Sequence, residues 1–287
     1  MATSQIQILD EQNSTYPSLL KEISDPPKAL HVLGSLPPTD TPWITVVGSR
    51  RISAYGRLAT KKIVTELVGY GCVIVSGLAL GLDSVAHAAA LDARGTTIAV
   101  LPSGIRRIYP ASHAGLAKRI LQNGGALISE YGDDRAPQKF SFTERNRIVA
   151  GMSQAVVVVE AAQRSGTLIT ARLGLEQNRE ICAVPGPINS PTSEGANMLI
   201  QSGAHAVTSG EDIIRAIGYE PTILEVKAYI PANETEQSIL QHLKDEMHID
   251  ELMQATGIQN ALLTSTLTML EIQGVIASTY TGVYIRK

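Results

Sequence analysis

The stretch WITVVGSRR places a glycine, a hydroxyl and a guanidinium directly after a short apolar run. Such a run is typical of a parallel strand covered on both faces, and a helix is expected after it. Ligands of such sheets bind outside the carboxyl ends of the strands, and helix N-termini favour anions. Gly48, Ser49 and Arg50 are therefore candidate ligands of a phosphate group. The alternative is an ordinary turn with solvated arginines.

A second candidate is KFSFTERNR, residues 139–147, which holds both phenylalanines of the chain. Single-stranded nucleic acid is held by aromatic rings on which bases stack and by cations that contact phosphates. The cations of this segment are Lys139, Arg145 and Arg147. The alternative is that the rings anchor a loop to the core.

A third candidate repeats the pattern of the first. Ser165, Gly166 and Thr167 follow an apolar run at 155–160 and lead into an expected helix at 167–178. A hydroxyl can cap that helix, and the free N–H groups of its first turn can meet a phosphate. A cap without a ligand is an equally open interpretation.

Asp83 and His87 lie four residues apart in SGLALGLDSVAHAAA, which places them on one face of an expected helix. Asp83 is expected to cap this helix and His87 to be structural, because no third ligand or nucleophile accompanies them. An acid–base or metal pair is the alternative.

Other chemistry is disfavoured by patterns that the sequence lacks. It has no GxGxxG, no GxxxxGK[ST], no HExxH and no CxxC, so no dinucleotide, no Walker-type nucleotide, no metal and no catalytic activity are expected. Cys72 and Cys182 lie in apolar runs and are expected to be reduced core residues, as in a cytosolic protein. Binding is therefore favoured over catalysis.

The 287 residues are 44% hydrophobic with a net charge of −3, so nucleic-acid binding would need a local basic patch. No apolar stretch approaches membrane-spanning length and the N-terminus lacks a signal pattern, so a cytoplasmic location is expected.

Strand-like and helix-like stretches alternate from Trp43 to about Gly218, which predicts an α/β fold. The expected architecture is a Rossmann-like, mostly parallel sheet with helices on both faces. Strands are expected at 44–47, 72–76, 97–101, 126–129, 155–160, 181–184 and 205–208, and helices near 54–69, 82–93, 112–123, 143–151, 167–178, 195–202 and 210–217.

Four parts are expected along the chain: an N-terminal lead-in at 1–42, the Rossmann-like domain at 43–218, a linker at 219–233 and a winged helix at 234–287. The winged helix is expected to comprise helices at 234–244, 248–256 and 260–273 and a two-stranded wing. DNA binding by it is disfavoured against a protein-contact role, because its recognition helix lacks cations. Residues 231–287 hold three basic side chains, Lys244, Arg286 and Lys287, against seven acidic ones, Glu234, Glu236, Asp245, Glu246, Asp250, Glu251 and Glu271.

The motifs VVGSR, SGLALGLDSVAHAAA, LISEY, KFSFTERNRIVAGMS, VVVVEAAQRSGTLITA and GANMLIQSGA occur in an order that resembles the DNA-processing protein A family, also called DprA or Smf. The resemblance covers roughly residues 16–287. It implies a homodimer without catalytic activity that binds single-stranded DNA, protects it, and loads the recombinase RecA onto it during natural transformation.

The resemblance also implies roles for individual residues. Arg50, Lys139 and Phe142 would line the DNA pocket, and the loop at 165–167 would complete it. The supporting residues would be Gly48, Ser49, Arg145 and Asn146.

The sequence also departs from the family pattern. Thr143 replaces a usual proline, Leu82 a usual isoleucine, and Arg107 an aspartate, which is expected to add positive charge near the pocket. An enzyme of the related phosphoribohydrolase type is an alternative, but only Gly166 and Thr167 match its PGGxGTxxE signature and no glutamate follows. A purely structural scaffold is a third possibility.

Overall fold

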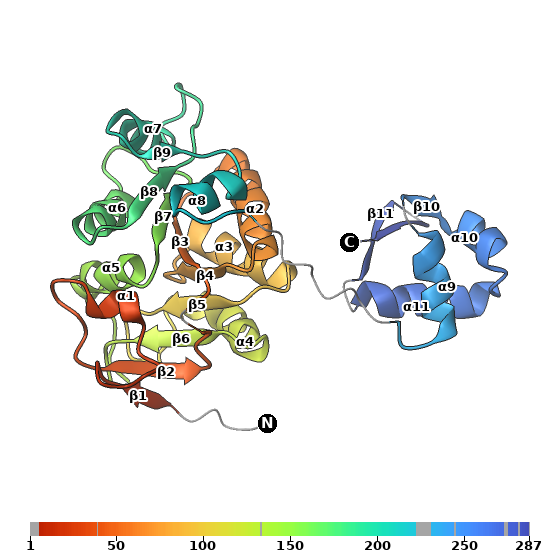
Figure 1. The fold of residues 1–287 in the computed structure, drawn as a ribbon, viewed down its shortest axis with the longest axis horizontal. Helices are drawn as coiled ribbons and strands as arrows, with labels where there is room; N and C mark the ends of the chain where they lie inside the picture. The colour runs from red at the N-terminus through yellow and green to blue at the C-terminus, as the bar shows by residue number, and fades with distance from the viewer. Residues whose placement is uncertain are drawn as a thin grey trace. The chain divides into compact units, whose positions relative to one another are not determined.

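The computed structural model describes residues 6–38, 40–132, 134–221, 231–243, 245–272, 275–280 and 282–286. The chain divides into two compact units, Met1–Leu224 and Glu225–Lys287 (Figure 1). Residues 222–230 of the expected linker lie outside the described residues. None of the helices in the described ranges has the length and apolarity needed to cross a lipid bilayer.

The first unit is built on one sheet, whose strands are β1 (Gln7–Leu9), β2 (Leu30–Gly34), β3 (Trp43–Val47), β4 (Val73–Ser76), β5 (Thr97–Val100), β6 (Ala126–Ser129), β7 (Ala155–Val158), β8 (Glu180–Ala183) and β9 (His205–Ala206). Their order in the sheet is β1-β2-β6-β5-β4-β3-β7-β8-β9. The strands from β3 to β9 are parallel to one another, which confirms the predicted fold class.

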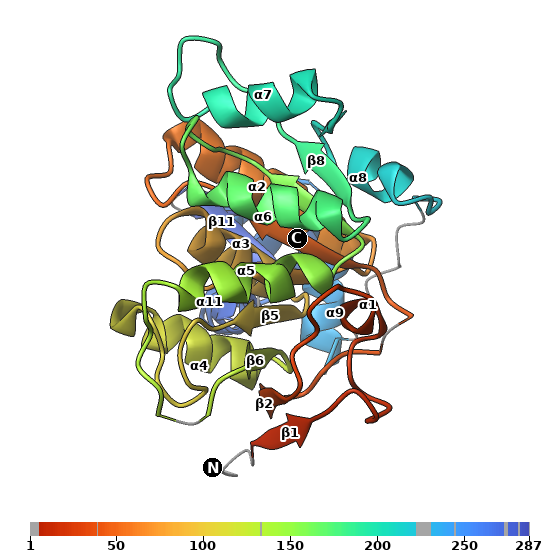
Figure 2. The ribbon, with the colours of Figure 1, turned by 90° about the vertical axis from the view of Figure 1, so that its left-hand side faces the viewer.

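Helices cover both faces of this sheet, as Figure 2 shows from the side. Apolar side chains from α2, α3, α4 and α8 pack on one face, and those from α1, α5, α6 and α7 pack on the other. The helices are α1 (Ser18–Lys21), α2 (Ala54–Gly69), α3 (Leu82–Asp92), the 3₁₀ turn η1 (Ala111–His113), α4 (Ala114–Gln122), α5 (Ser141–Gly151), α6 (Gly166–Glu176), α7 (Glu194–Gln201) and α8 (Gly210–Ala216).

Strand β3 lies in the interior of the sheet and is buried along its whole length. Trp43 and Val47 belong to the core on the α5 side, whereas Ile44 and Val46 belong to the core on the α2 side. This alternation is the period of two that a strand imposes on its side chains. Thr45 is accommodated because its hydroxyl donates to the Val149 carbonyl at 2.6 Å.

The N-terminal segment is part of the sheet, which corrects its interpretation as a lead-in. β2 pairs antiparallel with β6, and β1 pairs antiparallel with β2. Tyr16 is buried, and its hydroxyl donates to the Pro27 carbonyl at 2.9 Å. Both strands are short and pair with partners distant in sequence, so local patterning gives little sign of them.

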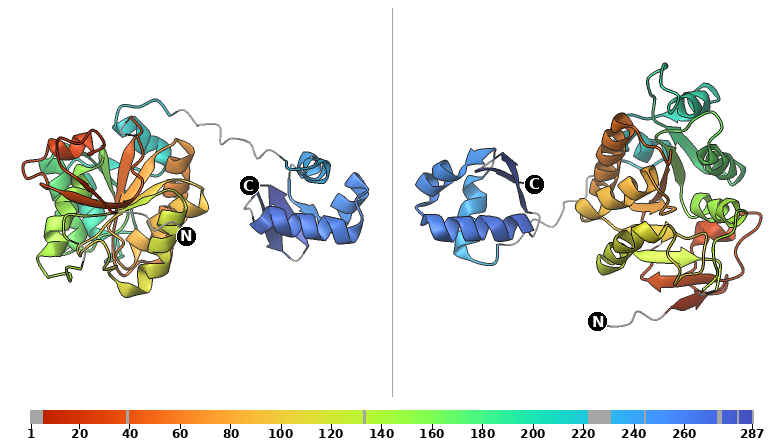
Figure 3. Two further views of the ribbon diagram at one scale, coloured as in Figure 1. Left: turned by 90° about the horizontal axis from the view of Figure 1, so that it is seen from below. Right: turned by 180° about the vertical axis from the view of Figure 1, so that it is seen from behind.

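The second unit contains α9 (Glu234–His242), β10 (Met247–His248), α10 (Ile249–Thr256), α11 (Asn260–Ile272), β11 (Ile276–Tyr280) and β12 (Val283–Arg286). Its strands form an antiparallel sheet in the order β10-β12-β11. Figure 3 shows the helices and strands of this unit, coloured blue, from two further sides. Leu240, Leu252, Leu263 and Leu267 form part of its own core. Three helices and an antiparallel wing give this unit the form of a winged helix.

Candidate nucleic-acid interface

A pocket of about 540 Å³ lies at the carboxyl ends of β3 and β7. The strand order reverses between these two strands, which is where sheets of this kind bind ligands. The three sequence stretches singled out above converge here, although they are distant in the chain. The lining includes every predicted site residue except Lys139, namely Gly48, Ser49, Arg50, Phe142, Arg145, Asn146, Ser165, Gly166 and Thr167.

The loop from β3 to α2 presents cations to the pocket, and Arg50 is the predicted one. Arg50 is exposed, whereas Ser49 is engaged within the loop. The Ser49 hydroxyl donates to the Arg51 carbonyl at 2.9 Å and accepts the Arg51 N–H at 3.1 Å. At Gly48, a Cβ atom would collide with Leu82 of α3, so the corner requires glycine. Gly48 and Ser49 therefore shape the loop, and the exposed side chain of Arg50 can meet a ligand.

Phe142 lies in the first turn of α5 and is half-buried at the pocket wall. The guanidinium carbon of Arg50 is 5.5 Å from the centroid of its ring. The ring of Tyr109 meets that of Phe142 edge-on, with centroids 5.5 Å apart and an interplanar angle of 71°. These contacts orient the Phe142 ring although Thr143 stands where the family usually has proline. A base can stack on such a ring while the neighbouring cation holds its phosphate.

Arg145 is buried beneath the pocket and is 6% exposed. Its Nη1 donates to the carbonyls of Gly77 and Val100, both at 2.5 Å. Burial lowers the pKa of Arg145 to about 10, and the neighbouring Asp83 carboxylate opposes that shift, so the guanidinium stays charged at neutral pH. These contacts tie Nη1 of Arg145 to the wall of the pocket. They agree with the supporting role that the resemblance implies for this residue.

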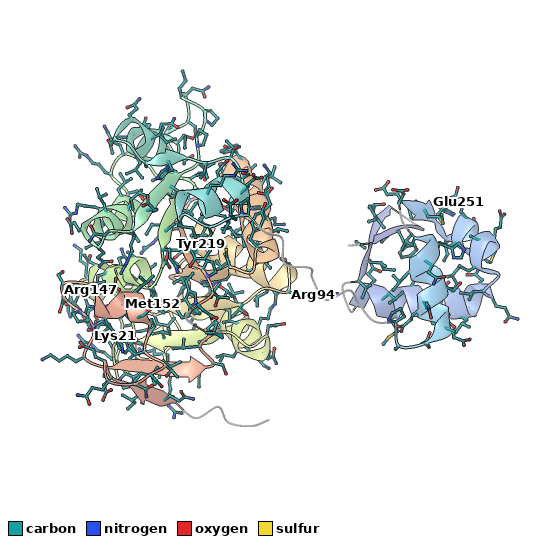
Figure 4. All side chains as sticks on the ribbon, in the orientation of Figure 1. Lys21, Arg94, Arg147, Met152, Tyr219 and Glu251 are labelled. Carbon is teal, nitrogen blue, oxygen red and sulfur yellow. The ribbon has the colours of Figure 1, made fainter. Side chains whose placement is uncertain are left out.

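Arg147, labelled in Figure 4, also has a structural role. Its guanidinium forms ion pairs with Asp25 at 3.2 Å and with Glu130 at 2.5 Å, and its side chain is 14% exposed. It therefore ties α5 to the N-terminal segment. Lys139 and Phe140 are exposed and lie outside the lining of the pocket. Of the cations in the KFSFTERNR segment, Lys139 is the one left free for a ligand.

The N-terminus of α6 opens onto the pocket. Ser165 is its N-cap and accepts the Thr167 N–H at 3.2 Å, which confirms the predicted cap. Thr167 is buried, while Gly166 is exposed. The first turn of α6 carries no acidic residue, so the positive end of the helix dipole is left uncompensated there.

Two further arginines line the pocket that were not chosen as site residues. Arg51 and Arg164 are exposed, and each is adjacent in sequence to a chosen residue. Among the described residues that line the pocket, Asp83 is the acidic one, and it is buried next to Arg145. The pocket surface is therefore strongly cationic although the chain is acidic overall. Arg107, in contrast, lies outside the lining.

The Asp83 and His87 pair is structural. Gly81 is the N-cap of α3, so the predicted cap is wrong: Asp83 accepts the N–H groups of Gly77 at 3.1 Å and Ala79 at 3.3 Å and shapes the β4–α3 loop. His87 is fully buried, its Nδ1 lies 2.7 Å from the Thr97 hydroxyl, and burial lowers its pKa to about 3. Within the described ranges no cluster of three or more metal-ligating side chains occurs.

Comparison with known proteins gives consistent results. Protein Smf of Escherichia coli K12 is 40% identical over 288 aligned residues, which cover 97% of this chain and 77% of that protein. The structure of DNA processing protein A from Streptococcus pneumoniae superposes with a TM-score of 0.70 at 40% identity, over 75% of each chain. The structure of DNA processing protein A from Helicobacter pylori, described for its single-stranded DNA binding mode, superposes with a TM-score of 0.67 at 33% identity and covers 75% of this chain and 96% of that one.

Family comparison assigns both units of the chain. Residues 7–218 match DNA recombination-mediator protein A, and residues 224–279 match the DprA winged helix domain. The resemblance inferred from the order of the motifs is confirmed. The chain belongs to the DNA recombination-mediator protein A family.

Proposed function

We propose that this protein is a recombination mediator that binds and protects incoming single-stranded DNA and loads RecA onto it during natural transformation. The observation that carries the proposal is the pocket, which is lined by three exposed arginines and by the ring of Phe142. Family membership and the single-stranded DNA binding mode described for the Helicobacter pylori relative support it.

The chemistry of the pocket favours single strands over duplex. A base can stack on the ring of Phe142 only if one face of the base is free, and bases in a duplex are already stacked on their neighbours. Stacking of one base on an aromatic side chain is worth about 1–3 kcal/mol. The exposed cations Arg50, Arg51 and Arg164 contact phosphates and carry no sequence information. Binding is therefore expected to tolerate many sequences and to weaken as salt rises.

The test is a fluorescence-anisotropy titration of a labelled oligo-dT at two salt concentrations. Arg50→Ala/Lys139→Ala should lower affinity about tenfold or more and reduce the magnitude of the salt slope by about 1.4, because two phosphate contacts are lost. The matched control is Lys28→Ala/Arg172→Ala, which removes two exposed cations that neither line the pocket nor belong to the three sequence stretches that meet there. Wild-type affinity in the Arg50/Lys139 variant would reject this site.

RecA loading and dimer formation are part of this proposal, are supported by family membership, and need their own measurements. A strand-exchange assay should show RecA displacing a single-stranded-DNA-binding protein faster when this protein is present. Sedimentation should give a homodimer, and fractionation should place the protein in the cytoplasm. The Arg50→Ala/Lys139→Ala variant should lose stimulation of RecA while it remains dimeric.

A phosphoribohydrolase activity is disfavoured by the pocket. The glutamate of PGGxGTxxE corresponds to Thr170, which lines the pocket but offers no acid–base group. The carboxylate of Asp83 is engaged by backbone N–H groups. Purified protein is therefore expected to release no adenine from AMP, and its release would revive this alternative.

A further inference from the structure

A second, smaller recess adjoins the proposed DNA pocket. The two share five lining residues: Arg50, Gly77, Ala79, Phe142 and Arg145. The recess adds walls that the pocket lacks, formed by Leu80, Pro102, Tyr109 and Pro110. A strand bound in the pocket would thus meet this recess next to Phe142.

The added walls are apolar and within reach of a ligand. Leu80 is 51% exposed and Tyr109 is 43% exposed, so both present apolar surface to a ligand. Nη1 of Arg145 is engaged by the Gly77 and Val100 carbonyls and its Nε by Asn146, so part of its hydrogen-bonding capacity is already used. Arg50, at the shared edge, is the cation available to a phosphate. The recess therefore suits an apolar group attached to a nucleotide.

The size of the recess narrows the choice further. Its volume is about 40 Å³, against about 540 Å³ for the pocket. This space holds a group of methyl size and not a whole base. Among the four DNA bases, thymine is the one that projects a methyl group from its edge. A thymine stacked on the ring of Phe142 can insert that methyl group into the recess.

We propose that this recess is a thymine-preferring base site, in which Tyr109 and Leu80 enclose the 5-methyl group of one nucleotide. This inference rests on the proposed single-stranded DNA binding and adds to it a mild base preference. Burial of one methyl group corresponds to about a fourfold gain in affinity.

The test compares oligo-dT with oligo-dU of equal length, because the two differ only in the 5-methyl group. Wild type should bind oligo-dT about fourfold more tightly than oligo-dU. Tyr109→Ala and Leu80→Gln should each bring this ratio to about one, because they open the walls of the recess. The matched control is Tyr219→Ala, since Tyr219 is also 43% exposed but lines neither the pocket nor the recess (labelled in Figure 4).

The outcomes separate the two proposals. Equal wild-type affinities for oligo-dT and oligo-dU overturn the thymine site and leave single-stranded DNA binding intact. A ratio that persists in both Tyr109→Ala and Leu80→Gln also overturns it, because the preference would arise elsewhere. Failure of wild type to bind either oligonucleotide overturns both proposals.

Discussion

The pocket of the sheet unit and helix α11 of the winged helix are both placed where such folds contact nucleic acid, yet their chemistry differs. Arg50, Arg51 and Arg164 are exposed in the pocket. α11, the expected recognition helix, carries neither lysine nor arginine. A fold can therefore keep the shape of a DNA-binding module without the cations that binding requires.

The two units also differ in the charges that they bury. Three ionisable side chains are buried behind the pocket. Asp83 accepts the Gly77 N–H, Arg145 donates to the Gly77 carbonyl, and His87 contacts the Thr97 hydroxyl of β5. The winged helix buries Glu236, whose carboxylate accepts the Ala232 N–H at 2.7 Å, while its His242 is exposed and its His248 is half-buried. The exposed arginines of the pocket therefore depend on a scaffold that contains buried charges. This dependence makes the sheet unit more sensitive to charge substitutions and to pH.

The largest effect is expected for Arg145→Met. The substitution leaves the Gly77 and Val100 carbonyls without their donor and leaves buried Asp83 without its cation. Breaking a buried charge pair in this way costs about 3–5 kcal/mol. Urea unfolding followed by fluorescence reports on the sheet unit alone, because Trp43 is the one tryptophan of the chain.

Two controls accompany Arg145→Met. Arg215→Met, which breaks an exposed pair with Glu211, should change stability by less than about 0.5 kcal/mol. Arg145→Met/Asp83→Asn should cost less than the sum of the single substitutions, because it leaves no unpaired buried charge. A loss below about 1 kcal/mol for Arg145→Met would contradict a scaffold role.

A smaller effect is expected from pH through His87. Burial, with Arg145 and His113 nearby, lowers the pKa of His87 from 6.5 to about 3. The unfolded chain therefore binds this proton more readily, so the stability is complete above pH 6.5 and falls as the pH drops toward 3. At about 1.4 kcal/mol per pH unit, His87 alone should remove about 2 kcal/mol by pH 5.

The contribution of His87 is measured by comparison with His87→Gln. Urea unfolding by Trp43 fluorescence at pH 7, 6 and 5 should give a steeper loss for wild type than for the variant. The difference between the two proteins reports the contribution of His87. Parallel slopes would show that protonation of His87 is not coupled to unfolding of the sheet unit.

The strands and helices of the core were predictable because their signals are local. β3, with apolar residues on both faces, and the Ser165 cap of α6 are encoded within a few residues. The three stretches meet in one pocket because each follows a parallel strand, and the carboxyl ends of parallel strands lie at the same edge of the sheet. The β1 and β2 strands were missed because they are short and pair across a long sequence separation.

The assignment of individual arginines was not predictable from the sequence. Arg50, Arg145 and Arg147 have the same chemistry and similar neighbours in sequence. Their burial differs because α5 directs Arg145 toward β4 and β5 and places Arg147 between Asp25 and Glu130. Both differences arise from tertiary packing. The same reason explains why Asp83 faces the preceding loop, since Gly81, with φ of 81°, takes the capping position of α3.

The smallest effect is expected when cations are added to the winged helix. Thr264 and Thr268 are exposed on one face of α11, one turn apart. In Thr264→Lys/Thr268→Lys, two new phosphate contacts should raise duplex affinity severalfold and steepen the salt slope by about 1.8. The control is Thr264→Gln/Thr268→Gln, which should match wild type in duplex titrations.

The reverse substitution distinguishes the two roles left open for the winged helix. Because α11 presents no cation to a phosphate, Thr264→Glu/Thr268→Glu should leave the affinities for duplex and single strands unchanged in anisotropy titrations. A loss of duplex binding in this variant would show that α11 already contacts DNA through neutral hydrogen bonds and helix N-terminal groups. The contrast with the pocket would then lie in the type of contact and not in its presence.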